Sequence, residues 1–292
     1  MVFVHGSAPT SRDFFGPIHC LFARHGFAVL AYDKRGVGKS TGHWLEADFG
    51  DLARDALAAV EYLKKRSEID ASKIGLWGGS QAGWIIPLAA SQSTDVAFIV
   101  IVSGPGVSPA EQGAQALREE MNLAGIPQEK IQEALARQKA DLDSLRSEEA
   151  RESLEAEVRK LKEEKNEVLL AANSSENPKF LLFLRGILDF DGIPHLERVQ
   201  CPALFVYGEL DRGVPVAGNK EKVEAALRRG GNSNFTIQVL PKANHVLLHA
   251  EKGTSAEFPQ LNRFADGFFD TMLDWLRKNV QPRLIPLCFP YR

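Results

Sequence analysis

Residues 73–90 read KIGLWGGSQAGWIIPLAA, and this stretch decides the fold. Its first five residues predict a buried β-strand, and residues 80–92 predict a helix. Only two glycines separate the elements, so Ser80 lies on a sharp strand-to-helix turn that needs small residues two positions before and after it. Gly78 meets the first need, and Ala82 stands where a second glycine is usual. The setting favours a nucleophilic serine over the alternative, a glycine-rich turn whose serine only caps the helix.

Other strands and helices alternate along the chain. Apolar runs predict strands at residues 2–5, 27–32, 97–102, 203–207 and 235–240. Amphipathic patterns predict helices at residues 51–65, 216–229 and 261–279. Most of the strand segments are apolar on both faces, which is typical of parallel strands covered by helices on each side. We therefore expect an α/β fold with a mainly parallel, doubly wound sheet.

The stretch from residue 108 to residue 199 interrupts this alternation, because it contains no convincing strand. Residues 128–170 are rich in charged residues, Gln and Ala, and predict two solvated helices. A coiled-coil partner surface is a weaker alternative, since the apolar heptad is not sustained. A strongly apolar patch follows at residues 180–190. We expect residues 1–107 and 200–292 to form the core, and residues 108–199 to form a helical cap, or lid, over a pocket. The alternative is a helical insertion that has no role at the pocket.

Composition and charge exclude several classes of protein. Of the 292 residues, 44% are hydrophobic and 25% charged, which is ordinary for a globular protein. The 35 Lys and Arg against 38 Asp and Glu leave a net charge of −3, so nothing points to a nucleic acid partner. No apolar run is long enough to span a bilayer. Cys20, Cys201 and Cys288 are too far apart for a zinc site or a disulfide framework, and the N-terminus does not resemble a signal peptide, so we expect a cytoplasmic location.

A nucleophilic serine needs a base and a group that orients the base. Asp211 follows the fifth predicted strand, and His245 follows the sixth. Because the carboxyl ends of parallel strands share one edge of a sheet, we expect both to meet Ser80 there. Glu209 is an alternative acid, and His249 is an alternative base. The remaining candidates have no strand-end setting and are expected to be structural or solvated: His19, His25, His43, His195, Asp189 and Asp191.

Two backbone N–H groups should bind the oxyanion that attack by a serine creates. Gln81, the residue after the nucleophile, supplies one of them. The first predicted strand ends in the sequence His5-Gly6-Ser7, and we expect the Ser7 N–H to be the other. Gly6 allows the backbone to approach the substrate, and His5 is expected to fix the loop rather than transfer a proton.

The sequence Gly36-Val-Gly-Lys-Ser40 resembles the end of a phosphate-binding loop. The full motif requires a glycine at position 33, where this chain has Asp33, and the next helix is predicted to begin only near Ala47. We interpret this segment as a glycine-rich loop braced by Asp33 and Arg35, not as a nucleotide site.

These motifs together resemble the α/β-hydrolase superfamily over most of the chain outside the insertion. The resemblance rests on residues 5–7, 32–38, 78–83, 208–211 and 244–245. The order serine, acid, histidine is also that of the catalytic triad in this fold. The sequence around the serine resembles that of bacterial esterases close to the prolyl oligopeptidase and dienelactone hydrolase branches. It also resembles the catalytic domain of acyl-CoA thioesterases.

The resemblance implies a serine esterase that cleaves a small-molecule ester or acyl substrate through an acyl-enzyme, without a metal or an organic cofactor. The apolar patch at residues 180–190 would then be the wall of an acyl pocket. A thioesterase or a small-peptide hydrolase would use the same triad. A non-catalytic member of the fold, with the insertion as a protein-binding arm, is the alternative from another class.

The resemblance also implies missing strands. Members of this fold usually carry at least two strands before the strand that here begins at residue 2, so the chain looks shortened at its N-terminus. The predicted strand at residues 27–32 would then lie at the edge of the sheet. Because it carries no proline and no inward charge, we expect a homodimer formed through this edge, or poor solubility.

Overall fold

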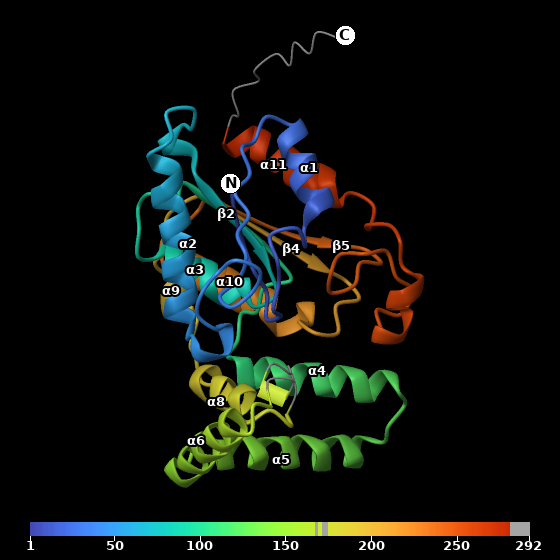
Figure 1. Ribbon diagram of the computed structural model, residues 1–292. Helices are drawn as coiled ribbons and strands as arrows, with labels where there is room; N and C mark the ends of the chain where they lie inside the picture. The colour runs from blue at the N-terminus through green and yellow to red at the C-terminus, as the bar shows by residue number, and fades with distance from the viewer. Residues whose placement is uncertain (167–168, 171–174, 281–292) are drawn as a thin grey trace.

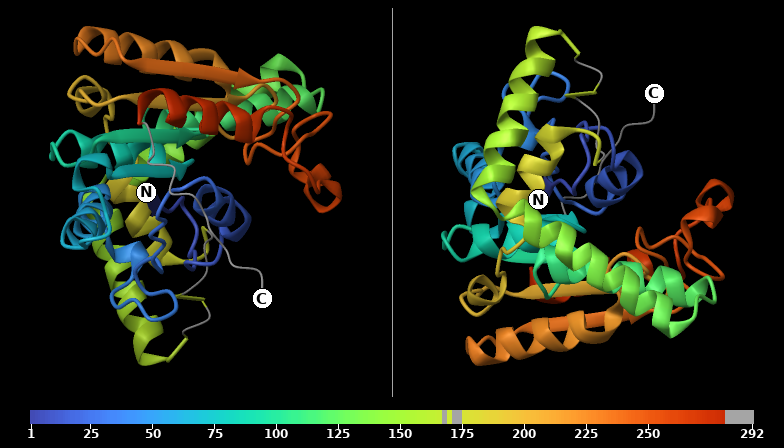
Figure 2. Two further views of the ribbon diagram at one scale, coloured as in Figure 1. Left: turned by 90° about the horizontal axis from the view of Figure 1, so that it is seen from above. Right: turned by 90° about the horizontal axis from the view of Figure 1, so that it is seen from below.

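Five parallel strands form one sheet in the computed structural model, which describes residues 1–166, 169–170 and 175–280 (Figure 1). The strands lie in chain order across the sheet: β1 (Val2–Val4), β2 (Gly75–Gly79), β3 (Phe98–Val102), β4 (Ala203–Gly208) and β5 (Phe235–Leu240). All five were predicted to within two residues at each end. Figure 2 shows β5 at one edge of the sheet and the N-terminal segment at the other.

Helices cover both faces of the sheet. One face packs against α2 (Phe49–Lys64), α3 (Ala82–Ala90) and α10 (Val216–Arg229), and the other against α1 (Gly16–Arg24) and α11 (Phe268–Asn279). Side chains alternate between the two cores because successive residues of a strand point to opposite faces. Ile99 and Ile101 of β3 enter the first core, whereas Val100 and Val102 enter the second. This arrangement confirms the predicted doubly wound α/β class.

Between β3 and β4 the chain forms α4 (Pro109–Leu123), α5 (Gln128–Leu145), α6 (Glu148–Glu163), α8 (Pro178–Ile187) and the short α9 (Ile193–Leu196). Figure 1 shows α4, α5, α6 and α8 gathered at one end of the molecule, and Figure 2, seen from below, shows them lying across that end. We refer to these four helices as the cap. Leu154, Val158, Leu161 and Val168 recur at near-helical spacing in the sequence and predict one apolar stripe. Val158 and Leu161 are buried in α6, and Val168 lies outside the described residues.

Ion pairs join the cap to the core at three places, one of them between Glu111 of α4 and Lys222 of α10 at 2.7 Å. Glu119 of α4 lies 3.1 Å from Arg212, which follows β4. Lys179 of α8 lies 2.9 Å from Glu46, which belongs to the 3₁₀ helix η1 (Trp44–Glu46). Polar contacts on both sides therefore fix the position of the cap over the carboxyl end of the sheet.

The predicted strand at residues 27–32 is wrong. Leu30 forms a single bridge with Val2, through the bonds Phe3 N–H to Leu30 O at 3.0 Å and Leu30 N–H to Met1 O at 2.9 Å. A strand forms by pairing along its length, and β1 offers only three residues to pair with. The segment therefore runs beside β1 without becoming a regular strand.

The predicted helix at residues 261–279 begins seven residues late, at Phe268. Gly267, at its N-cap, has a φ of 80°, a left-handed conformation that favours glycine. Before it the chain passes through the 3₁₀ helix η3 (Ser255–Gln260), and Phe264 forms an antiparallel bridge with Leu248. The apolar residues before Gly267 thus pack in a loop. The helices α1 and α4 and the 3₁₀ helices η1, η2 (Ala71–Lys73) and η3 were also not predicted.

The described residues were searched for a membrane-spanning helix and for a metal site. None of their helices combines the length and the apolar character that crossing a membrane requires. Within the same residues, no group of three or more His, Cys, Asp and Glu side chains is placed to hold a metal ion. Cys20 and Cys201 are free thiols, and Cys288 lies outside the described part of the chain.

Candidate active site

Ser80 lies on the turn between β2 and α3, as the sequence predicted. Its φ of 57° is in the left-handed region, which non-glycine residues seldom adopt. Its N–H donates to Val102 O at 2.9 Å, so the neighbouring strand β3 holds the strained residue in place. A Cβ atom on Gly78 would approach Val4 O to 2.7 Å and the Ala82 Cβ to 2.6 Å. Glycine is therefore required at position 78, and the alanine that replaces a second glycine fits because its partner across the turn has no side chain.

Ser80, His245 and Asp211 form one chain of hydrogen bonds. The His245 Nε2 atom lies 3.0 Å from Ser80 Oγ, and His245 Nδ1 lies 2.9 and 3.0 Å from the two carboxylate oxygens of Asp211. The three residues follow β2, β5 and β4, whose carboxyl ends meet at the same edge of the sheet. The predicted trio is thus brought together although up to 165 residues separate its members.

Asp211 is buried and held by the backbone that follows it. Its Oδ1 atom accepts hydrogen bonds from the N–H groups of Gly213 at 2.9 Å and Val214 at 2.7 Å. Burial alone would lower the pKa of His245, but the charge of Asp211 and its hydrogen bond to Nδ1 outweigh burial, and the pKa is raised above its ordinary value. The arrangement can thus orient the imidazole and stabilise its protonated form.

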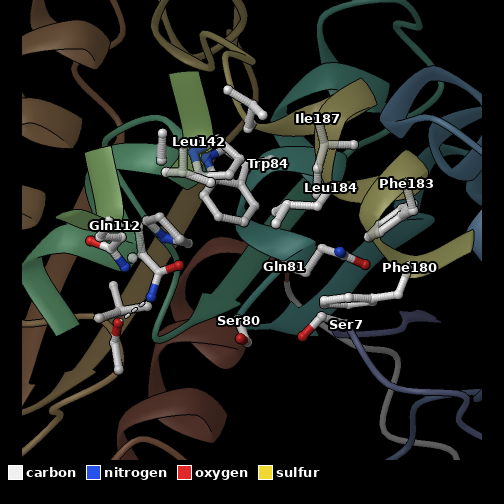
Figure 3. Close-up of a pocket in the computed structure, with 18 of the residues that line it drawn as sticks. Ser7, Ser80, Gln81, Trp84, Gln112, Leu142, Phe180, Phe183, Leu184 and Ile187 are labelled. Atoms are coloured by element: carbon white, nitrogen blue, oxygen red, sulfur yellow. Dashed lines mark hydrogen bonds between the residues drawn. The ribbon is translucent and has the colours of Figure 1, made fainter. Parts of the chain in front are cut away.

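The amides of Ser7 and Gln81 meet the requirement for an oxyanion site. Both residues line the same cavity as Ser80 (Figure 3). Among the described residues, neither amide N–H donates a hydrogen bond to another protein group. Gly6 lies against the turn, where a Cβ atom would stand 3.4 Å from Gly79 O and 3.8 Å from the Ser80 Cβ. Two uncommitted donors therefore flank the serine.

His5 is buried, and its Nε2 atom bonds to Tyr32 O at 2.5 Å. Burial lowers the pKa of His5 to about 4, so the ring is neutral near pH 7. The neutral ring joins the end of β1 to the neighbouring segment, which is the loop-fixing position that the sequence suggested.

Lys34 is a residue of this site that the sequence analysis missed. Its side chain is 2% exposed, and its Nζ atom donates to Gly6 O at 2.5 Å, to Ala8 O at 3.4 Å and to Gln81 Oε1 at 3.2 Å. The same atom lies 4.6 Å from the ring centroid of Trp44. Burial lowers the pKa of Lys34 to about 7. One amine thus connects the loop that carries Ser7 to the residue that carries the second free N–H.

The alternative acid and base lie elsewhere. Glu209 accepts a hydrogen bond from Lys242 N–H at 2.9 Å, and His249 Nε2 lies 3.8 Å from Glu251. Asp189 pairs with Arg146 at 2.6 Å, and Asp191 accepts from Ile193 N–H at 2.9 Å, both at the surface.

The four other histidines make local contacts away from Ser80. His19 packs on the ring of Phe3 at 4.3 Å, and His25 Nδ1 bonds to Leu21 O at 2.8 Å. His43 caps η1, and His195 stacks on Phe190 at 5.5 Å.

The loop that resembles a phosphate-binding loop is held by hydrogen bonds to its own residue Asp33. Asp33 accepts hydrogen bonds from Lys39 N–H at 3.2 Å and from the Arg12 guanidinium at 2.6 Å, and the Arg12 bond is the main reason that the pKa of Asp33 is lowered. Arg35 pairs with Asp55 of α2 at 2.5 Å. No helix begins at Ser40, so the loop lacks the helix N-terminus that phosphate binding would use.

A cavity of about 370 Å³ opens between Ser80 and the cap; we call it the cap-side cavity. Figure 3 shows Ser7 and Ser80 along one side, with Trp84, Leu142 and Ile187 across from them. The α8 residues that line it are all apolar: Phe180, Phe183, Leu184 and Ile187. Of the apolar patch predicted as a pocket wall, Phe190 packs instead against Phe49, at 5.0 Å between ring centroids.

Comparisons with known proteins identify the family of the chain. The Hydrolase_4 family model, described as "Serine aminopeptidase, S33", matches residues 1–252. A bifunctional esterase/perhydrolase of Acinetobacter calcoaceticus is 30% identical over 129 residues, which are 44% of this chain and 43% of that protein. An uncharacterized 31.7 kDa protein of Escherichia coli is 34% identical over 79 residues, 27% of this chain and 28% of its own length. The chain thus spans less than half the length of the curated relatives that it matches.

Solved structures share the fold. The esterase Pf2001 of Pyrococcus furiosus superposes with a TM-score of 0.52 at 18% identity, over 96% of this chain and 82% of that one. The α/β-hydrolase GrgF from Penicillium sp. sh18 gives a TM-score of 0.57 at 19% identity, over 96% and 89%. The predicted fold is confirmed; the narrower placement near the prolyl oligopeptidase and dienelactone hydrolase branches stays a prediction.

Proposed function

Because the chain belongs to the serine aminopeptidase S33 family of α/β-hydrolases, we propose that it is a serine hydrolase that cleaves carboxylic esters. The observation that carries the proposal is the unbroken chain of hydrogen bonds from Ser80 Oγ through His245 to Asp211, at the mouth of a largely apolar cavity.

The geometry supports a two-step reaction. Ser80 Oγ attacks the carbonyl carbon while His245 Nε2 takes the serine proton, and the Ser7 and Gln81 amides stabilise the oxyanion. The C–O bond to the alcohol then breaks, and His245 gives its proton to the departing oxygen. Water, activated by the same imidazole, hydrolyses the acyl-enzyme and restores Ser80. Asp211 holds the imidazole tautomer in which Nε2 is free to accept.

The lining of the cavity favours an ester over the substrate of an aminopeptidase. An aminopeptidase must bind the ammonium group at the end of a peptide, and a carboxylate is the usual partner for a buried cation. The described residues that line the cap-side cavity include no Asp and no Glu, and the cavity offers apolar side chains and amides instead. The buried carboxylate of Asp211 is already committed to His245 and to two backbone N–H groups.

The family description keeps one second candidate open, which is a hydrolase of small peptides with the same triad. A thioesterase would share the chemistry and differ only in the leaving group. We also propose that the cap, within the insertion of residues 108–199, is the lid of the acyl site, because α8 supplies more apolar residues to the lining of the cavity beside Ser80 than any other helix does.

Labelling with a fluorophosphonate probe, together with a panel of p-nitrophenyl esters, acyl-CoAs and aminoacyl amides, tests the proposal. We expect covalent labelling at Ser80 and turnover of the esters at least tenfold faster than that of the amides. Labelling with preferred cleavage of aminoacyl amides would establish the peptidase instead, and no labelling together with no turnover would contradict a serine hydrolase.

A further inference from the structure

Ser80 borders a second cavity, on the side away from the cap. It has a volume of about 520 Å³ and lies between the segment that enters α1 and the segment from His245 to Phe268. None of the described residues of the insertion 108–199 lines it. Figure 1 shows α1 and α11, whose first turns adjoin this space, at the opposite end of the molecule from the cap. We call it the α1-side cavity.

The two cavities meet at the reacting groups. Ser7, Ser80 and His245 line both of them. The serine oxygen therefore stands between two separate spaces, which is the arrangement needed to hold the two halves of an ester, one on each side of its carbonyl carbon.

The lining of the α1-side cavity is apolar and aromatic. Its described lining residues include no Asp, Glu, Lys or Arg, and beyond the three shared residues Thr10 is the one polar side chain among them. Six aromatic side chains contribute to it: Phe14, Phe15, Trp77, Phe258, Phe264 and Phe268. Such a lining favours a bulky apolar or aromatic group and disfavours a sugar, a phosphate or a free amine.

Large apolar side chains are exposed at the mouth of this cavity. Phe14 is 62% exposed, Val246 43% and Phe258 38%. These are three of the six most exposed large hydrophobic residues in the described chain, and all three line this cavity. Single exposed apolar side chains are common on proteins, but their concentration around one opening marks a place where a ligand covers them.

The position of His245 indicates which half of the ester belongs here. The departing oxygen must lie near Nε2 to receive its proton, and Val246 and Leu248, which follow His245, line the α1-side cavity and not the cap-side one. Gln81, whose amide is one of the two proposed oxyanion donors, lines the cap-side cavity alone. The alcohol therefore points toward the α1 side and the acyl chain toward the cap.

We propose that the α1-side cavity is the leaving-group subsite and that it takes the aromatic or branched apolar alcohol of the ester. The proposal rests on the esterase function above and adds the class of its substrate. In the acylation step the bond from Ser80 Oγ to the acyl carbon forms, the bond to the alcohol oxygen breaks, and the alcohol leaves through this cavity with the proton from His245.

Butyrate esters of methanol, benzyl alcohol and 2-naphthylmethanol test the subsite, since they share an acyl group and differ only in the alcohol. We expect kcat/KM to rise along this series. Phe258→Ala and Phe14→Ala should lower the ratio of kcat/KM for the naphthylmethyl ester to that for the methyl ester by about tenfold, because burial of an aromatic surface is lost. Leu123→Ala and Tyr62→Ala, which truncate similarly exposed residues at 41% and 55% that line neither cavity, should leave the ratio within twofold.

Two outcomes would overturn the subsite. An equal effect of Phe258→Ala on all three alcohols would mean that the cavity does not hold the alcohol. An effect that follows acyl length and appears in the deacylation rate, measured after the alcohol has left, would assign the cavity to the acyl chain instead.

A binding measurement separates this proposal from the esterase function. Calorimetric titration of 2-naphthylmethanol into Ser80→Ala protein, which requires no turnover, should show binding that Phe258→Ala weakens about tenfold. Binding without hydrolysis by the parent protein would refute the esterase and with it the leaving-group role, and would retain only a binding site for an aromatic alcohol. Hydrolysis of methyl butyrate without such binding would refute the subsite and retain the esterase.

Discussion

The backbone of Ser80 carries strain that its neighbours offset. A non-glycine residue at a φ of 57° costs on the order of 1–3 kcal/mol, and the hydrogen bond to Val102 together with the close packing of Gly78 holds it there. The strained turn aims Oγ at His245 instead of into the helix. The sequence could predict this because the serine, the small residues around it and the two flanking elements are all adjacent in the chain.

The raised pKa of His245 predicts the pH below which hydrolytic activity is lost. The imidazole must be neutral to accept the Ser80 proton, and a raised pKa keeps it protonated to higher pH. We expect kcat/KM to fall as the pH drops through a value above about 6.5, the ordinary histidine pKa. Asp211→Asn removes the charge that raises the pKa and leaves burial to lower it, so the acid limb should move to lower pH while kcat falls about 10³–10⁴-fold. A pH–rate profile checks this, and an unshifted limb would contradict it.

Lys34 is predicted to position the oxyanion site without touching the substrate. Lys34→Met removes the donor to the carbonyl oxygens of Gly6 and Ala8 and to Gln81, so the two free amides should lose their alignment. We expect kcat to fall about 10- to 100-fold, less than when an oxyanion donor itself is removed, with KM changed less than threefold. Lys34→Arg, which keeps the charge and the donors, should recover part of kcat. A loss confined to thermal stability would show that Lys34 is only structural.

Residues of the site differ in how readily sequence reveals them. Asp211 and His245 were found because each follows a strand, and strand ends can be read from local apolar runs. Lys34 was missed because a lysine in a loop is usually solvated. Its burial depends on Trp44 and Gln81, which reach it only through tertiary packing. The composition of the loop gave no sign of this contact.

At the scale of elements, contact with a partner segment determines whether an apolar stretch becomes a regular strand or helix. The segment at residues 27–32 has the composition of a strand, yet it forms one bridge because β1 is its one neighbour in the described sheet. The start of α11 was misjudged for a related reason, since the apolar residues before Gly267 pack against the His245 loop. Both errors concern segments whose structure depends on a distant partner.

The cap is predicted to set acyl-chain length. Leu184→Trp adds bulk to the α8 wall of the cap-side cavity, so long acyl chains should clash while short ones still fit. We expect kcat/KM for p-nitrophenyl octanoate to fall at least tenfold and that for the acetate to fall less than threefold. Leu181→Trp, on the same helix but outside the cavity lining, is the matched control. Equal losses for all chain lengths would argue that α8 does not contact the acyl group.

At the scale of the whole molecule, the edge beside β1 remains open to another chain. In the described structure the N–H groups of Val29 and Ala31 donate to no protein group, and Ala28 is exposed. Such an edge can pair with a second copy. We predict a dimer by light scattering at high protein concentration, and Ala28→Lys should shift it to a monomer because a charge then lies on the edge. A monomer at every concentration would contradict the predicted homodimer.

The molecule as a whole brings three strand ends and two cavities to one serine. The topology and the triad could be predicted because they follow from strand order. The α1-side cavity could not, since its walls come from segments as far apart as Phe14 and Phe268, and no local pattern joins them.

The most direct test of this account is the kcat for p-nitrophenyl butyrate of Ser80→Ala, His245→Ala and the double variant. We predict that each single variant loses about 10⁴–10⁶-fold and that the double variant is little worse, because the residues act as a unit. Glu209→Gln and His249→Ala should each cost less than about tenfold, or about 1.4 kcal/mol. Hydrolysis by Ser80→Ala well above background, or loss of turnover in His249→Ala while His245→Ala stays active, would contradict the account.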